Sequence, residues 1–329
     1  MENYVIQVEA SIYITEKCNL RCRHCYVPKT PKSLKVRHIE YIMDEFPIDR
    51  TVLLGGEPLL YKDLSRILEI LPNVTISTNA QLLDKKLKEI EGVRAVQISV
   101  EGTKDYNDYI RGEGTFDKCI RNALLLKNIG IDVHLRVGYC DENLNYVVDL
   151  IENYSKPLEI PTVLFPRIDK PPLNTDAQLW LYTYVMNIKD VNVFVSQPNF
   201  FCFIGSKGYC PAGSHRINFT ADGRITPCNM DFNYVVGMLD MKGNHHSTWD
   251  EVEEALETYC RFVKIPYPEC VGCKYMHICK SGCKVANTYL GCPLRRHISI
   301  RDIESGLSLD DIKNKRGEFR KFVKSIFSC

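Results

Sequence analysis

The pattern that most constrains the fold is an alternation of short β-rich runs with amphipathic helical runs, from residue 10 to about residue 165. Six strand–helix pairs can be distinguished, with strands over residues 12–15, 51–54, 74–78, 95–100, 133–137 and 160–165. Repeated βα units arrange parallel strands around a common core. Six units are too few for a closed eight-stranded barrel. The alternation therefore predicts an α/β fold, a partial (β/α)6 TIM-like barrel.

Polar motifs follow four of these strands at their carboxyl ends, where barrels of this kind carry their chemistry. Taken singly, each has an ordinary structural explanation: a glycine pair makes a turn, an asparagine caps a helix, and an arginine pairs with a carboxylate. Their convergence on one edge predicts a binding site. The residues concerned are Gly55, Gly56, Glu57, Pro58, Ser77, Thr78, Asn79, Ser99, Glu101 and Arg136.

Three cysteines, Cys18, Cys22 and Cys25, lie in the loop directly after the first strand. Three thiolates from one short loop can hold three irons of a four-iron cluster, which leaves the fourth iron open for chemistry. A structural zinc loop, or three unrelated buried cysteines, is the alternative interpretation.

The composition excludes some classes of binding partner and indicates the cellular compartment of the protein. The chain has 42 Lys and Arg residues against 41 Asp and Glu residues, so its net charge does not favour binding to nucleic acid or to an anionic membrane. No stretch approaches the roughly 18 apolar residues of a membrane span, and the start of the chain has no signal-peptide core. These features predict a cytoplasmic protein, in which 15 cysteines indicate metal ligation rather than disulfides.

Beyond about residue 191 the βα alternation fails and the cysteines crowd together. We expect three parts: a barrel over residues 1–190, a cysteine-rich domain over 191–296, and a tail over 297–329 whose apolar periodicity predicts a terminal helix. Little apolar periodicity remains in the middle part, so bound metal would have to replace a conventional core there. Its cysteines are Cys202, Cys210, Cys228, Cys260, Cys270, Cys273, Cys279, Cys283 and Cys292.

Residues 10–165 resemble the radical S-adenosylmethionine (radical SAM) enzymes in three features. These are the Cys-x3-Cys-x2-Cys spacing, Tyr26 directly after the last cysteine, and Gly55-Gly56-Glu57-Pro58 after the second strand. The resemblance implies a cluster held by Cys18, Cys22 and Cys25, whose open iron is chelated by S-adenosylmethionine. One electron then breaks a carbon–sulfur bond and releases a 5′-deoxyadenosyl radical that abstracts hydrogen.

The same resemblance assigns cofactor contacts to the strand ends. The backbone of Gly55-Gly56-Glu57-Pro58 would receive the ammonium group, Tyr26 would lie near the adenine, and Ser99 with Glu101 near the ribose. Asn79, which follows Ser77 and Thr78, suits a ribose or carboxylate contact, and Arg136 could neutralise the methionine carboxylate. The family commonly has aspartate where this chain has Glu101.

The later cysteines resemble the seven-cysteine SPASM extension of some radical SAM enzymes. The pattern is Cys210-x12-Gly223-x4-Cys228, then Cys270-x2-Cys273-x5-Cys279-x3-Cys283, then Cys292. In relatives this domain holds two auxiliary four-iron clusters, so the resemblance implies three 4Fe-4S clusters in all. Cys270, Cys273, Cys279 and Cys292 would bind one auxiliary cluster, and Cys210, Cys228 and Cys283 the other. A pair of structural zincs is the alternative.

One auxiliary cluster lacks a fourth ligand in this scheme. Cys202 lies eight residues before Cys210, where fully ligated relatives carry an extra cysteine, and we assign it there. Cys260 is the competitor, but its surroundings predict a helix in which the cysteine belongs to the core.

The implied reaction is hydrogen abstraction coupled to oxidation or cross-linking of a peptide or protein, as in sulfatase-maturating enzymes and peptide maturases. An electron donor such as ferredoxin or flavodoxin is implied. Because only about ten residues precede the first strand, we expect that a leader peptide would need a separate binding protein, or that the substrate binds directly. Sulfatase-maturating relatives carry a basic aspartate where this chain has Asn229, so Asp231 is the candidate base. Tetrapyrrole side-chain oxidation or decarboxylation is the alternative reaction, and an iron–sulfur electron carrier or zinc-stapled interaction protein the non-enzyme alternative.

Overall fold

The computed structural model describes residues 8–204, 210–243, 245–276, 282–288, 290–296 and 299–300. The chain divides into two compact units, each made of two chain segments: residues 1–135 with 211–260, and residues 136–210 with 261–329. Cys279 and the predicted terminal helix lie outside the described residues. The domain boundary at 190/191 stays a prediction.

Strand β1 (Val8–Tyr13) is the centre of the first unit, because it has a parallel partner on each side. One partner is β2 (Ile48–Leu54), with Ile12 opposite Leu53, and the other is β8 (Arg216–Phe219), with Ile12 opposite Phe219. All six residues of β1 are buried, as expected of a parallel strand covered on both faces.

The remaining strands of this unit extend the sheet in both directions. β3 (Val74–Thr78) follows β2 and β4 (Ala95–Val100) follows β3, all parallel. Beyond β8 the sheet turns antiparallel through β9 (Arg224–Thr226) and β10 (Gly237–Met238). The Asp222-Gly223 turn joins β8 to β9, and the φ of +93° at Gly223 confirms the predicted hairpin turn.

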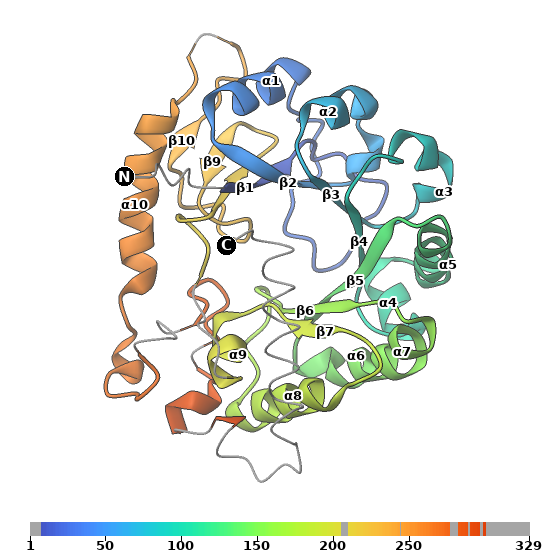
Figure 1. Ribbon diagram of the computed structural model, residues 1–329, viewed down its shortest axis with the longest axis vertical. Coiled ribbons are helices and arrows are strands. Elements are labelled where there is room, and N and C mark those ends of the chain that lie inside the picture. Colours follow the sequence, from blue (N-terminus) through green and yellow to red (C-terminus); the bar gives the residue numbers. More distant parts are fainter. Residues whose placement is uncertain are drawn as a thin grey trace. The chain divides into compact units, whose positions relative to one another are not determined.

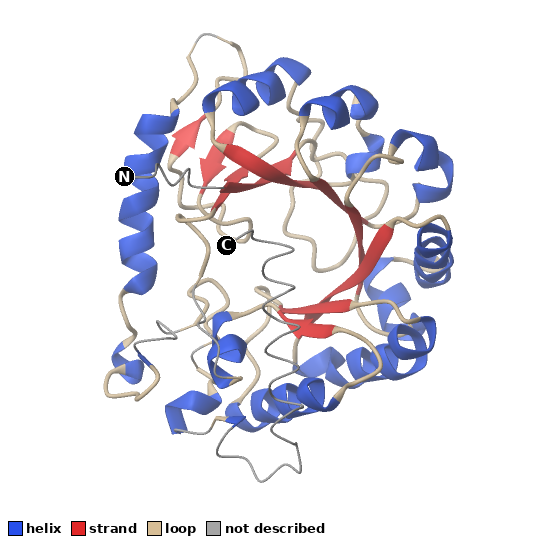
Figure 2. Cartoon of the chain, in the orientation of Figure 1, coloured by secondary structure: helices blue, strands red, loops and turns tan. Residues whose placement is uncertain are grey.

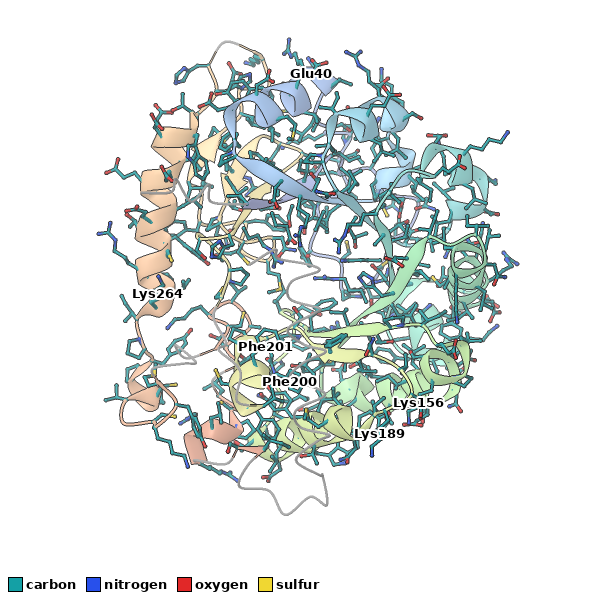
Figure 3. All side chains as sticks on the ribbon, viewed as in Figure 1. Glu40, Lys156, Lys189, Phe200, Phe201 and Lys264 are labelled. Atoms are coloured by element: carbon teal, nitrogen blue, oxygen red, sulfur yellow. The ribbon has the colours of Figure 1, made fainter. Side chains whose placement is uncertain are left out.

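Helices connect the parallel strands of the first unit along one side of the sheet (Figure 1). Their inward residues, such as Ile39, Ile42 and Leu64, are fully buried, while Glu40 on α1 points away from the strands (Figure 3). The connecting helices are α1 (Val36–Glu45), the short 3-10 turn η1 (Pro58–Leu60), α2 (Leu64–Ile70), α3 (Leu83–Lys86), the 3-10 turn η2 (Leu87–Glu89), α4 (Lys104–Arg111) and α5 (Thr115–Asn128).

The second unit continues the βα pattern. It contains the second half of β5 (Asp132–Tyr139), then β6 (Thr162–Pro166) and β7 (Val193–Val195), and β6 and β7 pair in parallel. The helices between them are drawn in blue in Figure 2. They are the 3-10 turn η3 (Asp141–Asn143), α6 (Leu144–Leu150), the π-helical turn η4 (Ile151–Ser155), α7 (Lys156–Leu158) and α8 (Thr175–Asn187), and α9 (Pro198–Phe203) follows β7.

Helix α10 (Trp249–Lys264) and the 3-10 turns η5 (Pro268–Cys270) and η6 (Pro293–Arg296) complete the described elements. The predicted α/β class is confirmed, and all six predicted parallel strands are present. The structure adds β7 and β8, which lie in the stretch where we expected the alternation to have ended. Among the described residues, no helix is long and apolar enough to cross a membrane.

Candidate active site

The three-cysteine loop leaves the carboxyl end of β1 and is closed at its base. Ile14 donates a backbone hydrogen bond to Leu54 of β2 (3.1 Å), and Leu34 donates one to Ile14 (2.9 Å). Thr15 and Ser33 form an isolated bridge whose hydroxyl oxygens are 2.7 Å apart. The loop therefore starts and ends at the same point of the sheet.

The thiols of Cys18, Cys22 and Cys25 lie close enough together to interact electrostatically. Burial raises the pKa of Cys22, the Arg111 guanidinium opposes that rise, and the two other thiols reinforce it. The Lys29 ammonium donates to the Cys25 sulfur at 3.0 Å, and the Asn79 amide lies 3.8 Å from the Cys18 sulfur. One loop thus brings together three thiols, which are of the type that binds soft metals, beside two hydrogen-bond donors.

The glycine pair after β2 is required by the approach of this loop. A Cβ on Gly55 would lie 2.6 Å from the Thr15 carbonyl oxygen, and one on Gly56 would lie 2.3 Å from that of Lys17. The backbone N–H groups of Gly56 and Glu57 donate to these same two oxygens at 2.7 and 2.8 Å. No larger residue fits, because the obstructing atoms belong to backbone and cannot rotate away.

Glu57 joins the end of β2 to the end of β3. Its fully buried carboxylate accepts hydrogen bonds from the Thr78 hydroxyl (2.6 Å), the Asn79 backbone N–H (2.8 Å) and the Leu59 backbone N–H (3.1 Å). Burial raises the pKa of Glu57 although these donors oppose the rise. The side chains of Glu57 and Thr78 therefore hold these two strand ends together. Pro58 is the first residue of the η1 turn.

Asn79 connects this scaffold to the cysteine loop. Its side-chain amide donates to the Asn19 side-chain oxygen at 2.8 Å, and its own side-chain oxygen accepts from the Gln81 backbone N–H at 2.9 Å. Its backbone oxygen accepts from the thiol of Cys119 at 3.4 Å. Burial raises the pKa of Cys119 to about 12, so this thiol stays protonated.

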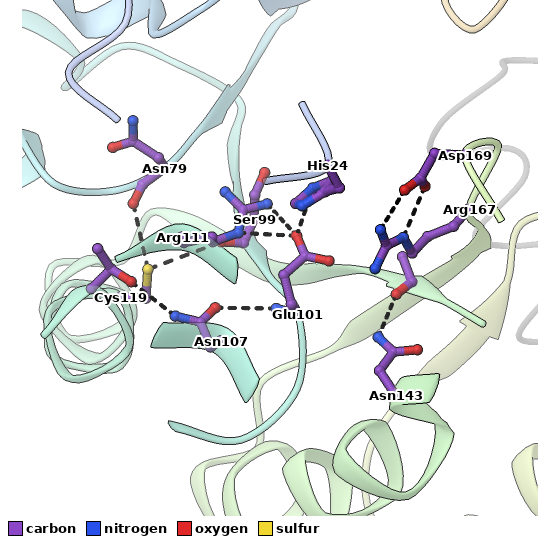
Figure 4. A network of polar contacts seen from close by, with 12 residues as sticks. His24, Asn79, Ser99, Glu101, Asn107, Arg111, Cys119, Asn143, Arg167 and Asp169 are labelled. Atoms are coloured by element: carbon purple, nitrogen blue, oxygen red, sulfur yellow. Dashed lines mark hydrogen bonds and ion pairs between the residues drawn. The ribbon is translucent and has the colours of Figure 1, made fainter. Parts of the chain in front are cut away.

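Glu101, after β4, forms a buried ion pair. Its carboxylate accepts from Arg111 Nε at 3.0 Å and Nη2 at 2.5 Å, and His24 Nε2 lies 3.3 Å away (Figure 4). Burial alone would raise the pKa of Glu101, but the Arg111 guanidinium and His24 bring it below its ordinary value. The Glu101 backbone N–H also donates a hydrogen bond to the Asn107 side-chain oxygen at 3.1 Å.

Tyr26 lies in an aromatic group beside the loop. Its hydroxyl is 3.2 Å from that of Tyr13, and its ring centroid is 5.6 Å from that of Phe232. Its side chain is 46% exposed, so one ring surface is available to a ligand.

The donor set fits an iron–sulfur cluster with one open iron. Within the described part of the chain, no three His, Cys, Asp or Glu side chains close on a single point as the ligands of one metal ion do. A four-iron cluster takes each cysteine at a different iron, so its sulfur ligands need not converge on one point. His24 Nδ1, next to the cysteines, is buried and has no hydrogen-bond partner among the described residues.

Comparison with protein families decides the assignment. The model of the radical SAM superfamily matches residues 12–153, which begin at β1 and contain the cysteine loop, the glycine pair and Glu101. The chain carries a radical SAM domain.

Two curated relatives differ in what they make. Fe-coproporphyrin III synthase of Methanosarcina barkeri is 32% identical over 163 residues, which are 44% of this chain and 41% of that protein. The chain thus spans less than half the length of this relative. GTP 3′,8-cyclase of Alkaliphilus oremlandii is 25% identical over 287 residues, covering 73% of this chain and 86% of that protein.

Two solved structures share the fold along most of the chain. anSMEcpe with bound AdoMet and the Cp18Cys peptide has a TM-score of 0.67 at 17% identity, with 96% of each chain covered. SuiB of Streptococcus suis bound to the precursor peptide SuiA has a TM-score of 0.64 at 16% identity, covering 89% of this chain and 76% of that one. At this identity the likeness concerns the fold.

The radical SAM domain thus brings together most of the residues that the sequence singled out. Cys18, Cys22, Cys25, the glycine pair and Asn79 belong to one hydrogen-bonded assembly, and Ser77 and Ser99 are half-buried near the ends of β3 and β4. Arg136 belongs to the second unit, where its guanidinium lies 4.6 Å from the centre of the Phe165 ring. The individual cofactor contacts stay predictions.

Three contributors near the cysteines were missed from sequence: His24, Lys29 and Arg111. Arg111 belongs to α4, a helix with few apolar residues that periodicity did not reveal. The position of His24 between Cys22 and Cys25 was the available signal that it lies beside the cysteines.

Asp231, the candidate base, lies in a turn after Cys228. Its backbone N–H donates to the Cys228 carbonyl at 3.2 Å. Its carboxylate accepts from the Tyr259 hydroxyl and the Asn233 backbone N–H, each at 3.3 Å. The carboxylate thus has local structural partners, and a catalytic role for Asp231 stays a prediction.

The cysteines of the second unit are largely buried. Cys202 and Cys292 pack with Leu294 in one apolar cluster, and the Cys273 thiol donates to the Leu294 carbonyl at 3.4 Å. Cys270 and Cys283 are buried, and Cys210 is half-buried. Cys260, which belongs to the first unit, is buried in α10, as its helical pattern predicted. The division of these cysteines between two clusters, with Cys202 as an additional ligand, stays a prediction.

Proposed function

We propose that this protein is a radical SAM enzyme that reductively cleaves S-adenosylmethionine and abstracts hydrogen from a peptide or protein side chain. The single observation that carries the proposal is the loop of Cys18, Cys22 and Cys25 on a backbone cradle that only Gly55 and Gly56 permit. An electron carrier or a zinc-stapled interaction protein has no need of a three-ligand set with one open position.

When bound, the cluster and S-adenosylmethionine together supply a 5′-deoxyadenosyl radical. Contacts between the start of the cysteine loop and the glycine pair fix the positions of the three thiolates relative to one another. Lys29 donates a hydrogen bond to the Cys25 sulfur and so helps to fix its position. The Glu101–Arg111 pair fixes the loop after β4 against His24, which shapes the wall beside the cysteines.

A peptide or protein substrate is favoured by the structural neighbours. anSMEcpe and SuiB, which share the fold along most of this chain, are bound to peptides in their solved structures. In this proposal the later cysteines hold two auxiliary clusters that pass electrons between the substrate and a carrier such as ferredoxin or flavodoxin. A separate leader-binding protein is part of the proposal if the substrate carries a leader.

Tetrapyrrole chemistry is the second candidate, favoured by the Fe-coproporphyrin III synthase, which is 32% identical to this chain over 163 residues. That alignment covers 41% of the relative's length. The two candidates share the radical SAM chemistry and differ in substrate. Fe-coproporphyrin III is therefore the direct probe: if it accelerates deoxyadenosine formation and is itself converted, the tetrapyrrole candidate replaces the peptide candidate.

Anaerobic reconstitution tests the proposed chemistry. With three four-iron clusters we expect about twelve irons per chain, and 5′-deoxyadenosine after addition of dithionite and S-adenosylmethionine. Cys22→Ala should lose about four irons and all cleavage, whereas Cys140→Ala, at a buried thiol outside the proposed ligand set, should retain both. Tightly bound zinc in place of iron, with no deoxyadenosine, would refute the proposal.

A further inference from the structure

The turn after β9, residues 228–232, packs against the residue that follows the last cysteine of the loop. The Phe232 ring centroid is 5.2 Å from that of Tyr13 at the end of β1 and 5.6 Å from that of Tyr26. The planes of Tyr13 and Phe232 meet at 78°, the edge-to-face arrangement that aromatic pairs favour. Three separate segments of the first unit therefore meet in one group of rings.

The tyrosine hydroxyls form a directed chain of hydrogen bonds. The Tyr13 hydroxyl donates to the Asn229 carbonyl oxygen at 3.0 Å, and this bond uses the single proton of that hydroxyl. The hydroxyl oxygens of Tyr13 and Tyr26 are 3.2 Å apart, so the Tyr26 hydroxyl is the donor of the bond between them. Tyr26 is therefore held at its hydroxyl by Tyr13 and at its ring by Phe232.

Phe232 is in turn fixed by Arg224 of β9. Arg224 Nη1 donates to the Phe232 carbonyl oxygen at 2.8 Å, and the guanidinium carbon lies 5.9 Å from the centre of the Phe232 ring. Arg224 Nε donates to the Asp222 carboxylate at 3.1 Å, and that carboxylate lies 3.6 Å from Lys32 Nζ, near the end of the cysteine loop. The 228–232 turn is thus connected to the cysteine loop at two places, Tyr26 and Lys32.

Tyr26 presents an exposed aromatic surface next to the three cysteines. It is 46% exposed although its hydroxyl is bonded, and it directly follows Cys25. Tyr109, another exposed aromatic residue near the loop, has the Arg23 guanidinium carbon 4.2 Å from its ring centre. S-adenosylmethionine contains a flat purine, and such bases stack favourably on exposed aromatic rings. The fixed Tyr26 ring is therefore suited to hold the purine.

We infer that Phe232 is a positioning residue for S-adenosylmethionine, because it holds the Tyr26 ring in the orientation in which that ring stacks on the purine. The inference rests on the proposed function, since it needs the cofactor to bind beside Cys18, Cys22 and Cys25. Phe232 acts through Tyr26 and not through a contact of its own with the cofactor.

The experiment measures the binding of S-adenosylmethionine to the full, anaerobically reconstituted chain by equilibrium dialysis, without reductant so that the cofactor is not cleaved. We expect Phe232→Leu to keep its iron content and to bind S-adenosylmethionine about tenfold more weakly, as for the loss of one aromatic contact. Phe232→Tyr, which keeps the ring, should bind as tightly as the wild type. An unchanged affinity in Phe232→Leu would overturn the inference.

Phe46→Leu is the matched control. Phe46 is buried, and its ring centroid lies 5.1 Å from that of Phe219 and 5.9 Å from that of Trp249. Both Phe→Leu substitutions should lower the urea midpoint, since each removes a packed ring, but only Phe232→Leu should weaken the binding of S-adenosylmethionine. Equal weakening in the two variants would show a general loss of stability and would overturn the role of Phe232.

A double-mutant cycle separates a role through Tyr26 from a direct contact with the cofactor. If Phe232 acts through Tyr26, Phe232→Leu should weaken binding in the wild-type background and have no further effect when Tyr26→Leu is already present. Losses that add in the double variant would overturn the positioning role.

The two proposals fail differently. A wild-type chain that neither binds nor cleaves S-adenosylmethionine would overturn the proposed function and the role of Phe232 with it. A wild-type chain that does both, beside a Phe232→Leu variant of equal affinity, would overturn the role of Phe232 alone.

Discussion

The pairing of Glu101 with Arg111 shows how one residue beside the cysteines depends on another. The side chains are 3% and 11% exposed, so removing Arg111 leaves a buried carboxylate without its main partner. Breaking a buried pair in this way costs about 3–5 kcal/mol. We therefore expect Arg111→Ala to lower the free energy of unfolding in urea by about that amount.

The control for this change is the exposed pair of Arg66 and Glu40, whose nearest atoms are 3.0 Å apart. Exposed pairs contribute roughly 0–1 kcal/mol, so Arg66→Ala should change the same measurement little. Equal losses in the two variants would show that Glu101 does not rely on Arg111.

The Glu101 pKa also predicts how stability depends on pH. Because the folded state lowers this pKa below the ordinary value of 4.5, the pair contributes fully above that value and its contribution is lost as the pH falls further. Urea midpoints measured from pH 7 to pH 3 should therefore fall more steeply for the wild type than for Glu101→Gln. Parallel profiles would contradict the assignment.

At the scale of elements, the approach of the cysteine loop to the end of β2 makes Gly56 sensitive to a single methyl group. A Cβ there would lie 2.3 Å from the Lys17 carbonyl oxygen, so Gly56→Ala must push the loop away. We expect a stability loss of about 1–3 kcal/mol, as for other overpacked sites, together with loss of iron from the cysteine loop.

Gly92→Ala provides the comparison, because a Cβ at Gly92 meets nothing within 4 Å. Iron per chain and urea midpoints measured side by side separate the two glycines. Full iron in Gly56→Ala would mean that the cysteine loop tolerates displacement.

Element boundaries show what the local sequence could not predict. Serine is a common helix cap, yet α1 starts at Val36 with Lys35 as its cap, and Ser33 lies outside the helix. The Ser33 hydroxyl is instead bonded to Thr15, a tertiary contact across the base of the cysteine loop. Helix α4 was missed because only Asn107 and Ile110 of its residues are buried.

The site was predictable to the extent that its chemistry lies in short motifs. The cysteine spacing and the glycine pair identified the radical SAM domain, which the family match bears out. The ribose contact expected of Glu101 stays a prediction, but its pairing with Arg111, ten residues later on an unpredicted helix, could not be read from the sequence. Partners of this kind depend on how elements pack, which periodicity does not report.

On the scale of the whole molecule, the first unit is built from two separate stretches of chain, residues 1–135 and 211–260. Strand β8 completes the sheet beside β1, with Ala10 opposite Ile217 and Ile12 opposite Phe219. This pairing spans some two hundred residues of sequence, and for that reason the alternation of βα units did not reveal it.

A fragment of residues 1–135 should therefore fail to fold, because the fully buried β1 would become an exposed edge. Joining residues 211–260 to that fragment by a flexible linker restores β8 and should restore cooperative unfolding. Circular dichroism during urea titration distinguishes the two chains. A cooperative transition in the shorter fragment would show that β8 is dispensable.

The closure of the cysteine loop has a consequence for protein engineering. The loop touches β2 through the glycine pair, Glu57 ties β2 to β3, and Asn79 returns from β3 to the loop through Asn19. Someone transplanting Cys18, Cys22 and Cys25 onto a foreign scaffold would have to move three strand ends with them, since a graft of residues 18–25 alone would leave the thiols without the frame that spaces them.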